Sequence, residues 1–298
     1  MKTSDWTDSP MPTCTDRADP LSEFVPGDTP GHRVDMDAPH ELFHEQTKYH
    51  RATSTGIFQT ITAHLEHPDL IAQGVFGRHV PSGRAVSLPA ANPINLSLSD
   101  ALGQRRSHRR EDVTRPMSLE ALSTLLHHAV RTNRKARVEK APGLIQHFSP
   151  YPSAGALYPC EVYLILGAVE PLPPGPYRYD PIEHTLTPCR SASTTKEAYT
   201  SVEASYGQSQ TPPACALVVT SVFQRVTGKY GARGYRLAVI EAGHILQNLS
   251  LVATALNLSS CVSASFFESE LERMIGVDGV SEAVLASFLC GAATGPDH

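Results

Sequence analysis

The spacing of apolar residues along the chain predicts alternating helices and strands. Between Ser118 and Val130 apolar residues recur every three or four positions, which predicts a helix with Ser118 at its N-cap. Residues 161–166 predict a strand, because residues 162–166 form a short apolar run. Residues 214–223 are rich in Val and Leu without alternation, which predicts a strand buried on both faces. Residues 237–256 are apolar almost all round, so we expect a long central helix shared between the core and a partner subunit.

Shorter patterns complete the predicted fold. Residues 177–186 hold two short strand-like runs joined by Asp180-Pro181, which predicts a hairpin, and residues 285–289 predict a last strand. Residues 41–65 contain enough apolar positions for one or two short helices that pack onto the main body. No G-x-G-x-x-G motif follows a predicted strand, so a dinucleotide-binding unit is not expected. The predicted class is α+β, with a mixed central sheet flanked by helices.

The first forty residues differ in composition from the rest of the chain. They contain six prolines, and residues 1–50 hold ten acidic residues against four basic ones. Such a segment cannot bury enough apolar surface to fold alone. We therefore expect a disordered, acidic, Pro-rich head over residues 1–40, an N-terminal extension packing on the core over residues 41–100, and the main domain over residues 101–298.

Overall composition narrows the function classes. A net charge of −5, with 41% hydrophobic and 18% charged residues, is typical of a soluble globular protein and does not indicate nucleic-acid or membrane binding. The six cysteines show no C-x-x-C pair and no histidine at zinc-ligand spacing, so neither a disulfide scaffold nor a metal site is expected. The N-terminus lacks the apolar stretch of a signal peptide, and no 18 consecutive residues are apolar. We expect a cytoplasmic protein.

Residues 152–159 form the most informative segment of the sequence. Two prolines enclose small residues, and the apolar run of a predicted strand follows. Gly155 and its flanking alanines allow backbone groups to come close to a ligand, while Pro159 prevents a helix and leads into the strand. The segment predicts a tight, rigid loop against which a flat molecule packs. Taken alone, it is equally an ordinary loop before a strand.

Two basic segments carry further candidate chemistry. Arg105, Arg106 and Arg109 surround Ser107, and three guanidinium groups with a hydroxyl suit a phosphate, although a basic run is more often a solvated face. The basic residues of 131–140 show no such pattern and predict an exposed loop, with contact to an acidic peptide substrate as the weaker alternative.

The dipeptide Lys229-Tyr230 is a candidate acid–base pair. Neither side chain is a base at neutral pH in water. In a dry pocket, burial lowers the pKa of a lysine, and an adjacent ammonium lowers the pKa of a phenol, so either residue could accept a proton. The alternative is a surface lysine beside a packed tyrosine.

A stripe of polar residues interrupts the long predicted helix. On this stripe lie Arg236, Glu241, His244, Gln247 and Asn248, at positions that share roughly one helix face. Buried polar groups on a central helix more often satisfy one another or a neighbouring loop backbone than bind a ligand directly.

The three segments around Arg105, Gly155 and Lys229, in this order, resemble the flavin-dependent nitroreductase superfamily. Within it they are similar to the SagB-type, or McbC-like, dehydrogenases, which oxidise thiazoline and oxazoline rings in peptides. This resemblance implies a nitroreductase-like fold with a long central dimer helix, FMN as cofactor, and Lys229 and Tyr230 as catalytic residues. It implies an FMN site formed by Arg105, Arg106, Ser107, Arg109, Pro152, Ser153, Ala154, Gly155, Leu157 and Arg236.

The resemblance also implies an activity and partners. We expect an FMN-dependent dehydrogenase that converts azolines to azoles in a peptide, with the loop of one subunit of a homodimer facing the flavin of the other. A separate cyclodehydratase or leader-peptide-binding protein would then present the substrate. His108 falls at a variable position of the arginine motif and receives no role. Two alternatives stay open: an NAD(P)H-dependent reductase of nitro, quinone or ene substrates with the same fold, and a non-catalytic scaffold subunit.

Overall fold

The computed structural model describes residues 39–49, 55–76, 85–108, 110–189 and 212–293. The chain divides into two compact units, the first ending at Lys48 and the second beginning at Tyr49. Within the first unit, helix α1 (Pro39–Gln46) buries none of its own side chains. Nearly all of the predicted head lies outside the described residues, so its disorder stays a prediction, as do the predicted domain boundaries.

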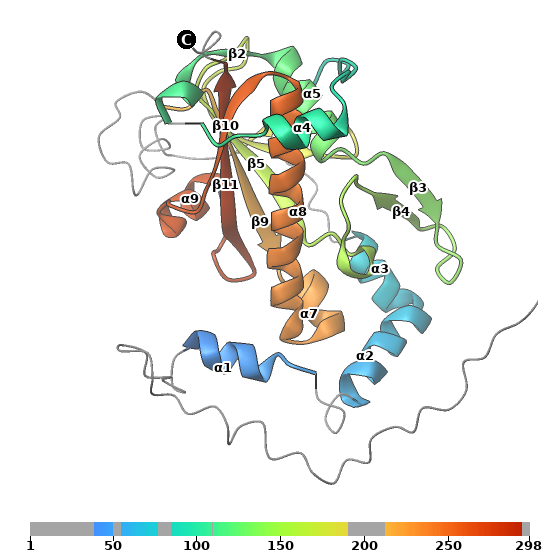
Figure 1. Ribbon diagram of the computed structural model, residues 1–298. Helices are drawn as coiled ribbons and strands as arrows, with labels where there is room; N and C mark the ends of the chain where they lie inside the picture. Colours follow the sequence, from blue (N-terminus) through green and yellow to red (C-terminus); the bar gives the residue numbers. More distant parts are fainter. Residues whose placement is uncertain (1–38, 50–54, 77–84, 109, 190–211, 294–298) are drawn as a thin grey trace, which may run out of the picture. The chain divides into compact units, whose positions relative to one another are not determined.

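A seven-stranded antiparallel sheet forms the centre of the second unit (Figure 1). Among the described residues, all strand pairings within it are antiparallel, whereas β2 (Met117–Ser118) and β6 (Val169–Glu170) pair in parallel outside it. The α+β class is therefore confirmed. The sequence predicted a mixed sheet, and the parallel pair of strands lies in the small two-stranded sheet β2–β6. In spatial order the strands are β1 (Val86–Ser87), β8 (Thr185–Pro188), β7 (Gly175–Asp180), β5 (Cys160–Leu166), β9 (Cys215–Val222), β11 (Glu282–Ala292) and β10 (Leu258–Ser263).

The core lies on both faces of the central strands β5 and β9. Leu164 packs in a cluster with residues of α5 (Leu119–Ala129) and α8 (Arg233–Ala255), whereas its neighbour Ile165 packs in a cluster with residues of α9 (Glu268–Ile275). Successive side chains of a strand point to opposite faces, so helices on both sides bury the whole strand. This explains the apolar runs without alternation, and the predicted burial of β9 on both faces is confirmed.

Most predicted elements are found, with shifted ends. Ser118 caps α5 by accepting a hydrogen bond from the backbone N–H of Ala121, and α8 begins four residues before the predicted start at residue 237. The hairpin is β7–β8, and the predicted last strand is extended to all of β11. The two short helices expected within residues 41–65 are α1 and α2 (Thr55–Glu66).

Other elements were not predicted. Helix α3 (Pro68–Phe76) and strand β10 are additional, and the stretch expected to be a basic exposed loop instead contains β3 (Arg134–Arg137), which pairs with β4 (Ile145–Phe148). All four residues of β3 are exposed. Strand β3 therefore has no buried face, and its sequence lacks the alternation that identifies a half-buried strand.

Helix α8 carries apolar side chains on its solvent side as well. Tyr235, Val239 and Ile240 are 42%, 45% and 54% exposed, while Ala238, Ile245 and other residues of the opposite side are buried. Among the described residues, α8 alone is long and apolar enough to span a membrane by length and composition. Its packing on α5 and the sheet identifies it as a core helix with a second, uncovered apolar face.

A buried polar network fixes the chain segment that leads to the arginine motif. Ser123 donates to the carbonyl oxygen of Pro89, the Nε2–H of His184 donates to Ser123 at 2.8 Å, and the hydroxyl of Tyr179 donates to Nδ1 of His184 at 2.8 Å. This pattern requires a neutral imidazole. Burial, together with Arg131 and His127, lowers the pKa of His184 to about 4.

We expect the stability of the fold to fall in mild acid because of His184. Its pKa is lower in the folded chain than the ordinary 6.5, so its contribution is complete above pH 6.5 and is lost as the pH falls towards 4. The measurement is the free energy of unfolding in urea at pH 7 and at pH 5. Between these two pH values, the free energy of unfolding of His184→Asn should fall by about 1–3 kcal/mol less than that of the wild type. Asparagine tolerates the positive φ of 55° at this position. The exposed His67→Asn should behave as wild type; equal pH dependence in His184→Asn would contradict the assignment.

Candidate functional site

The loop of residues 152–159 meets the Lys229-Tyr230 dipeptide directly. A Cβ atom at Gly155 would lie 2.6 Å from the hydroxyl oxygen of Tyr230 and 2.9 Å from Nζ of Lys229, and Gly155 has a φ of +62°. Only glycine fits this backbone conformation and this close approach without displacing the two side chains. Ala156 and Tyr158 also have positive φ, which marks a strained loop held by its surroundings. The structure therefore brings together two of the three segments selected from the sequence.

Lys229 is buried and Tyr230 half-buried at the end of α7 (Gln224–Tyr230). Burial lowers the pKa of Lys229. Burial raises the pKa of Tyr230, and Tyr49 adds to that shift. Nζ of Lys229 lies 5.4 Å from the centroid of the Tyr230 ring. The environment therefore favours the neutral forms of both side chains, and of these two a neutral lysine is the one that can accept a proton.

A buried ion-pair cluster holds α7 against this loop. Nη1 of Arg225 donates to Oε1 of Glu161 at 2.6 Å and to the carbonyl oxygen of Tyr158 at 3.1 Å. Glu161 lies in β5, and its other carboxylate oxygen accepts from Arg178 at 3.0 Å. Arg225 precedes Lys229 by one helical turn, so the cluster sets the position of the lysine relative to the loop.

The polar stripe of α8 holds the loop from its other side. The backbone N–H of Cys160 donates to Glu241 at 3.2 Å. Nδ1 of His244 lies 3.2 Å from the carbonyl oxygen of Pro152. The side-chain amide of Asn248 donates to the carbonyl oxygen of Pro150 at 3.4 Å. Glu241, His244 and Asn248 therefore contact backbone groups at or next to the loop, as predicted for buried polar residues of a central helix. Burial raises the pKa of Glu241 to about 7.

The remaining predicted loop residues fit this arrangement. Ser153 accepts a hydrogen bond from the backbone N–H of Tyr158 at 2.8 Å, and Ala154 begins the short 3-10 turn Ala154–Ala156. Leu157 caps that turn and lines the pocket described below. Arg236 is half-buried in the first part of α8. The structure does not bring it into that pocket lining, so its predicted cofactor contact stays a prediction.

The arginine motif follows helix α4 (Leu98–Gln104), which Ser97 caps. Arg105 is half-buried, while Arg106 and Ser107 are exposed, and the guanidinium of Arg106 donates to the carbonyl oxygens of Gly103 and Arg105. Arg109 lies outside the described residues.

His108, which received no role from the sequence, anchors this motif to strand β10. Its backbone N–H donates to the carbonyl oxygen of Ser260 at 2.9 Å, and its Nδ1 accepts from the backbone N–H of Ser260 at 3.1 Å. The motif is thereby fixed beside the segment that follows the C-terminal end of α8.

The arginine motif and the Lys229-Tyr230 dipeptide lie towards opposite ends of α8. The dipeptide immediately precedes the N-terminal end of the helix, and α4 lies across it near its C-terminal end (Figure 1). A helix of 23 residues is about 34 Å long. One copy of the chain therefore does not place the predicted phosphate-binding residues beside the predicted base.

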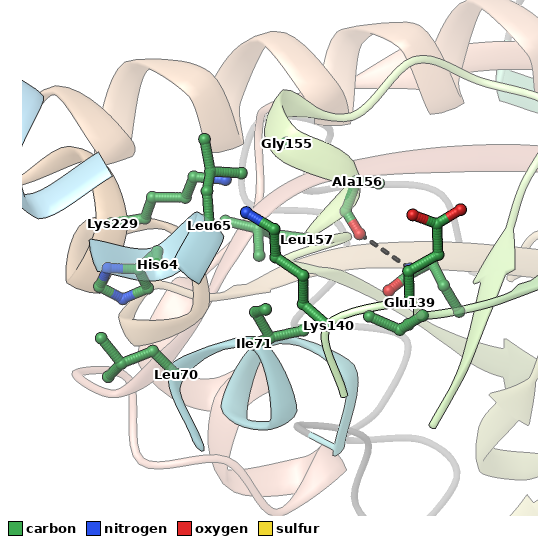
Figure 2. Close-up of a pocket in the computed structure, with 12 residues that line it drawn as sticks. His64, Leu65, Leu70, Ile71, Glu139, Lys140, Gly155, Ala156, Leu157 and Lys229 are labelled. Carbon is green, nitrogen blue, oxygen red and sulfur yellow. Dashed lines mark hydrogen bonds between the residues drawn. The ribbon is translucent and has the colours of Figure 1, made fainter. Parts of the chain in front are cut away.

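A pocket of about 380 Å³ opens beside Lys229 (Figure 2). Its lining comes from four parts of the chain: α2 and α3, the β3–β4 hairpin, the loop around Gly155, and α7. Gln146 closes one wall by donating to the carbonyl oxygen of Ala156 at 2.9 Å. The lining residues are His64, Leu65, Leu70, Ile71, Val138, Glu139, Lys140, Gln146, Gly155, Ala156, Leu157 and Lys229.

Several of these functional positions were not identified from the sequence. A signal existed for Arg225, because Glu161 is a charged residue within a strand buried on both faces and requires a buried cationic partner. The contributions of α2 and α3 gave no comparable signal, since their approach to α7 depends on packing between distant segments. In the described part of the chain, no group of three His, Cys, Asp or Glu residues could hold a metal ion.

Comparison with known proteins identifies relatives. The Nitroreductase family model matches residues 102–292. The chain is 29% identical over 192 residues to the nitroreductase-named protein MJ1384 of Methanocaldococcus jannaschii, covering 64% of this chain and 89% of that protein. It is 34% identical over 141 residues to the microcin B17-processing protein McbC of Escherichia coli, covering 46% of this chain and 51% of McbC. The match thus spans about half the length of McbC.

A solved structure extends the similarity. The Escherichia coli microcin synthetase McbBCD complex with truncated pro-MccB17 bound contains a chain that is 25% identical, with a TM-score of 0.56. The match covers 88% of this chain and 99% of that chain.

Proposed function

The chain belongs to the nitroreductase family, and from this premise we propose that it is an FMN-dependent dehydrogenase that oxidises thiazoline or oxazoline rings of a peptide to thiazoles or oxazoles. The observation that carries the proposal is the contact between the Gly155 loop and Lys229-Tyr230, beside a pocket. It places a buried lysine with a lowered pKa where a substrate could reach it. Similarity to McbC, a peptide-processing protein, supports a peptide substrate.

The chemistry of the ring explains why a neutral lysine is needed. An azoline becomes an azole by losing a proton from Cα and a hydride from Cβ. The Cα–H is acidic because it lies between a C=N bond and a carbonyl group. Nζ of Lys229, whose pKa burial lowers, accepts this proton, and Arg225 and Gly155 fix its position. Tyr230 keeps its phenolic proton and orients the pair.

The proposed cofactor is FMN, which accepts the hydride when bound. The donor set at the end of α4 fits its phosphate, because Arg105, Arg106 and Ser107 offer guanidinium and hydroxyl donors at a partly open surface. We place the ring system of FMN against residues 152–157, whose small side chains leave the backbone accessible.

We expect Arg105→Ala to weaken FMN binding about 10–100-fold, which corresponds to the loss of one charge-assisted phosphate contact. The measurement is a titration of apo-protein with FMN, followed by flavin fluorescence. Arg137→Ala, in exposed β3, removes an equal charge outside the motif and should bind FMN like the wild type. If both variants lost FMN affinity equally, the effect of Arg105 would come from overall charge and not from a contact with the phosphate.

A complete site requires two copies of the chain in this proposal. Because about 34 Å of α8 separates the arginine motif from Lys229, we propose a homodimer in which the motif of one subunit meets the loop and lysine of the other. The uncovered apolar face of α8, with Val239 and Ile240, supports such an interface.

The proposal also includes partners and a location. A cyclodehydratase must form the azoline before this chain can oxidise it, and the similarity to a chain of the McbBCD complex supports a separate protein in that role. We place the reaction in the cytoplasm.

The direct test is incubation of the purified, FMN-loaded protein with a defined azoline peptide under air. The expected result is a mass decrease of two hydrogens with the ultraviolet absorbance of an azole. Bleaching of the flavin by NADPH, with no azole formed, would instead identify a nitro, quinone or ene reductase. A protein that purifies colourless and binds no FMN would indicate a scaffold subunit.

A further inference from the structure

The pocket beside Lys229 is largely apolar and receives its outer wall from α2 and α3. Leu70 and Ile71 come from α3 and Leu65 from α2 (Figure 2), while Val138 and Leu157 complete the apolar lining. Helix α2 contacts α7, and α3 contacts both α7 and β4, so this wall is packed onto the elements that position Lys229. A concave site with an apolar lining and a few polar groups is typical of a small-ligand pocket.

The wall comes from outside the part of the chain that the Nitroreductase family model matches. That match begins at residue 102, whereas α2 and α3 end at residue 76. The machinery proposed for proton removal lies within the matched region. The extension therefore adds a surface that is not needed for the proton transfer itself but reaches the same pocket.

We propose that this pocket binds the apolar side chain of the residue next to the azoline ring, so that α2 and α3 select the peptide. This inference rests on the proposed function. A peptide whose ring carbon lies near Nζ of Lys229 brings its neighbouring side chain within the same pocket, because adjacent residues are only about 3.8 Å apart. Burial of that side chain against Leu65, Leu70 and Ile71 favours a large aliphatic or aromatic residue over glycine.

The chemistry of the pocket does not suit the phosphate of the cofactor, and its apolar wall from α2 and α3 suits a side chain. Among the described residues its lining contains no arginine, and the guanidinium groups of Arg105 and Arg106, proposed for the phosphate, belong to a motif towards the other end of α8. The polar groups at its edge, His64, Glu139 and Lys140, carry both signs of charge and suit the peptide backbone that enters.

The experiment compares three azoline peptides that differ only beside the ring: leucine before it, leucine after it, or glycine on both sides. With wild type, kcat/KM should be about 10–100-fold higher for one leucine peptide than for the glycine peptide. Ile71→Phe, which fills the pocket, should lower this ratio at least tenfold, and Ile71→Ala, which removes contacts, should lower it less. Val280→Phe, at a residue that is 79% exposed, is the matched control and should keep the wild-type ratio.

Two further measurements separate the possible failures. Calorimetry with the corresponding azole peptides reports binding without turnover, and flavin content reports whether Ile71→Phe displaces FMN. Turnover without leucine preference, an unchanged ratio in both Ile71 variants, or loss of FMN in Ile71→Phe would overturn the pocket assignment while azoline oxidation stands. Leucine-selective binding that Ile71→Phe abolishes, with no turnover of any peptide, would support the pocket and overturn the proposed oxidation. Neither binding nor turnover would overturn both.

Discussion

Lys229→Arg is expected to lower the rate of azole formation about 10²–10⁴-fold, as severely as Lys229→Ala, with FMN still bound. A guanidinium stays protonated at any accessible pH, so it preserves the charge but cannot accept a proton. If Tyr230 were the base, a permanent cation beside it would preserve activity. The direction of the two pKa shifts, down for Lys229 and up for Tyr230, favours the lysine. The measurement is azole formation by mass spectrometry in a single turnover.

The pH dependence gives a second readout of the same assignment. With Lys229 as the base, kcat/KM should rise with pH through the pKa of this lysine, which burial moves below its ordinary value. Tyr230→Phe should lower the rate while leaving that rise in place. Lys135→Arg, in exposed β3, serves as the control for arginine substitution and should match wild type. Substantial turnover by Lys229→Arg would contradict the mechanism.

Arg225→Ala is expected to destabilise the fold by about 3–5 kcal/mol and to lower kcat beyond what the loss of folded protein explains. It removes a donor to both Glu161 and the Tyr158 carbonyl, which together fix the start of α7 against the loop. Another partner of Glu161, Arg178, lies on β7. Urea unfolding measures the stability, and kcat of the fully folded, FMN-loaded fraction measures the positioning effect.

Arg178→Ala is the matched control for this variant. It also removes a cationic partner of the same buried carboxylate, so it should destabilise the fold as well. It lies on β7 and donates to Glu161, whereas Arg225 also donates to the backbone of the loop. We therefore expect kcat of its folded fraction to stay near wild type, and partial rescue of kcat in Arg225→Lys. Equal kcat losses in Arg178→Ala and Arg225→Ala would assign Arg225 a purely structural role.

Sequence patterns predicted the elements whose burial follows a simple rule. Strand β9 is buried on both faces and shows the expected apolar run, and α5 begins at the predicted N-cap Ser118. The contact between Gly155 and Lys229 was not predictable from spacing, because it depends on how α7 turns back against the loop. The pocket wall from α3 and the anchoring of His108 to Ser260 likewise depend on long-range packing, which leaves no local periodicity.

The length of α8 has a genetic consequence for an enzyme assembled as proposed. If each active site takes its phosphate-binding motif from one subunit and its base from the other, two inactive variants can restore each other. Arg105→Ala combined with Arg109→Ala damages only the first half-site, and Lys229→Ala damages only the second. In a randomly mixed population, half of the dimers contain one of each subunit and carry one intact site, so about a quarter of the wild-type sites should return. Sites contained within a single chain would show no complementation at all.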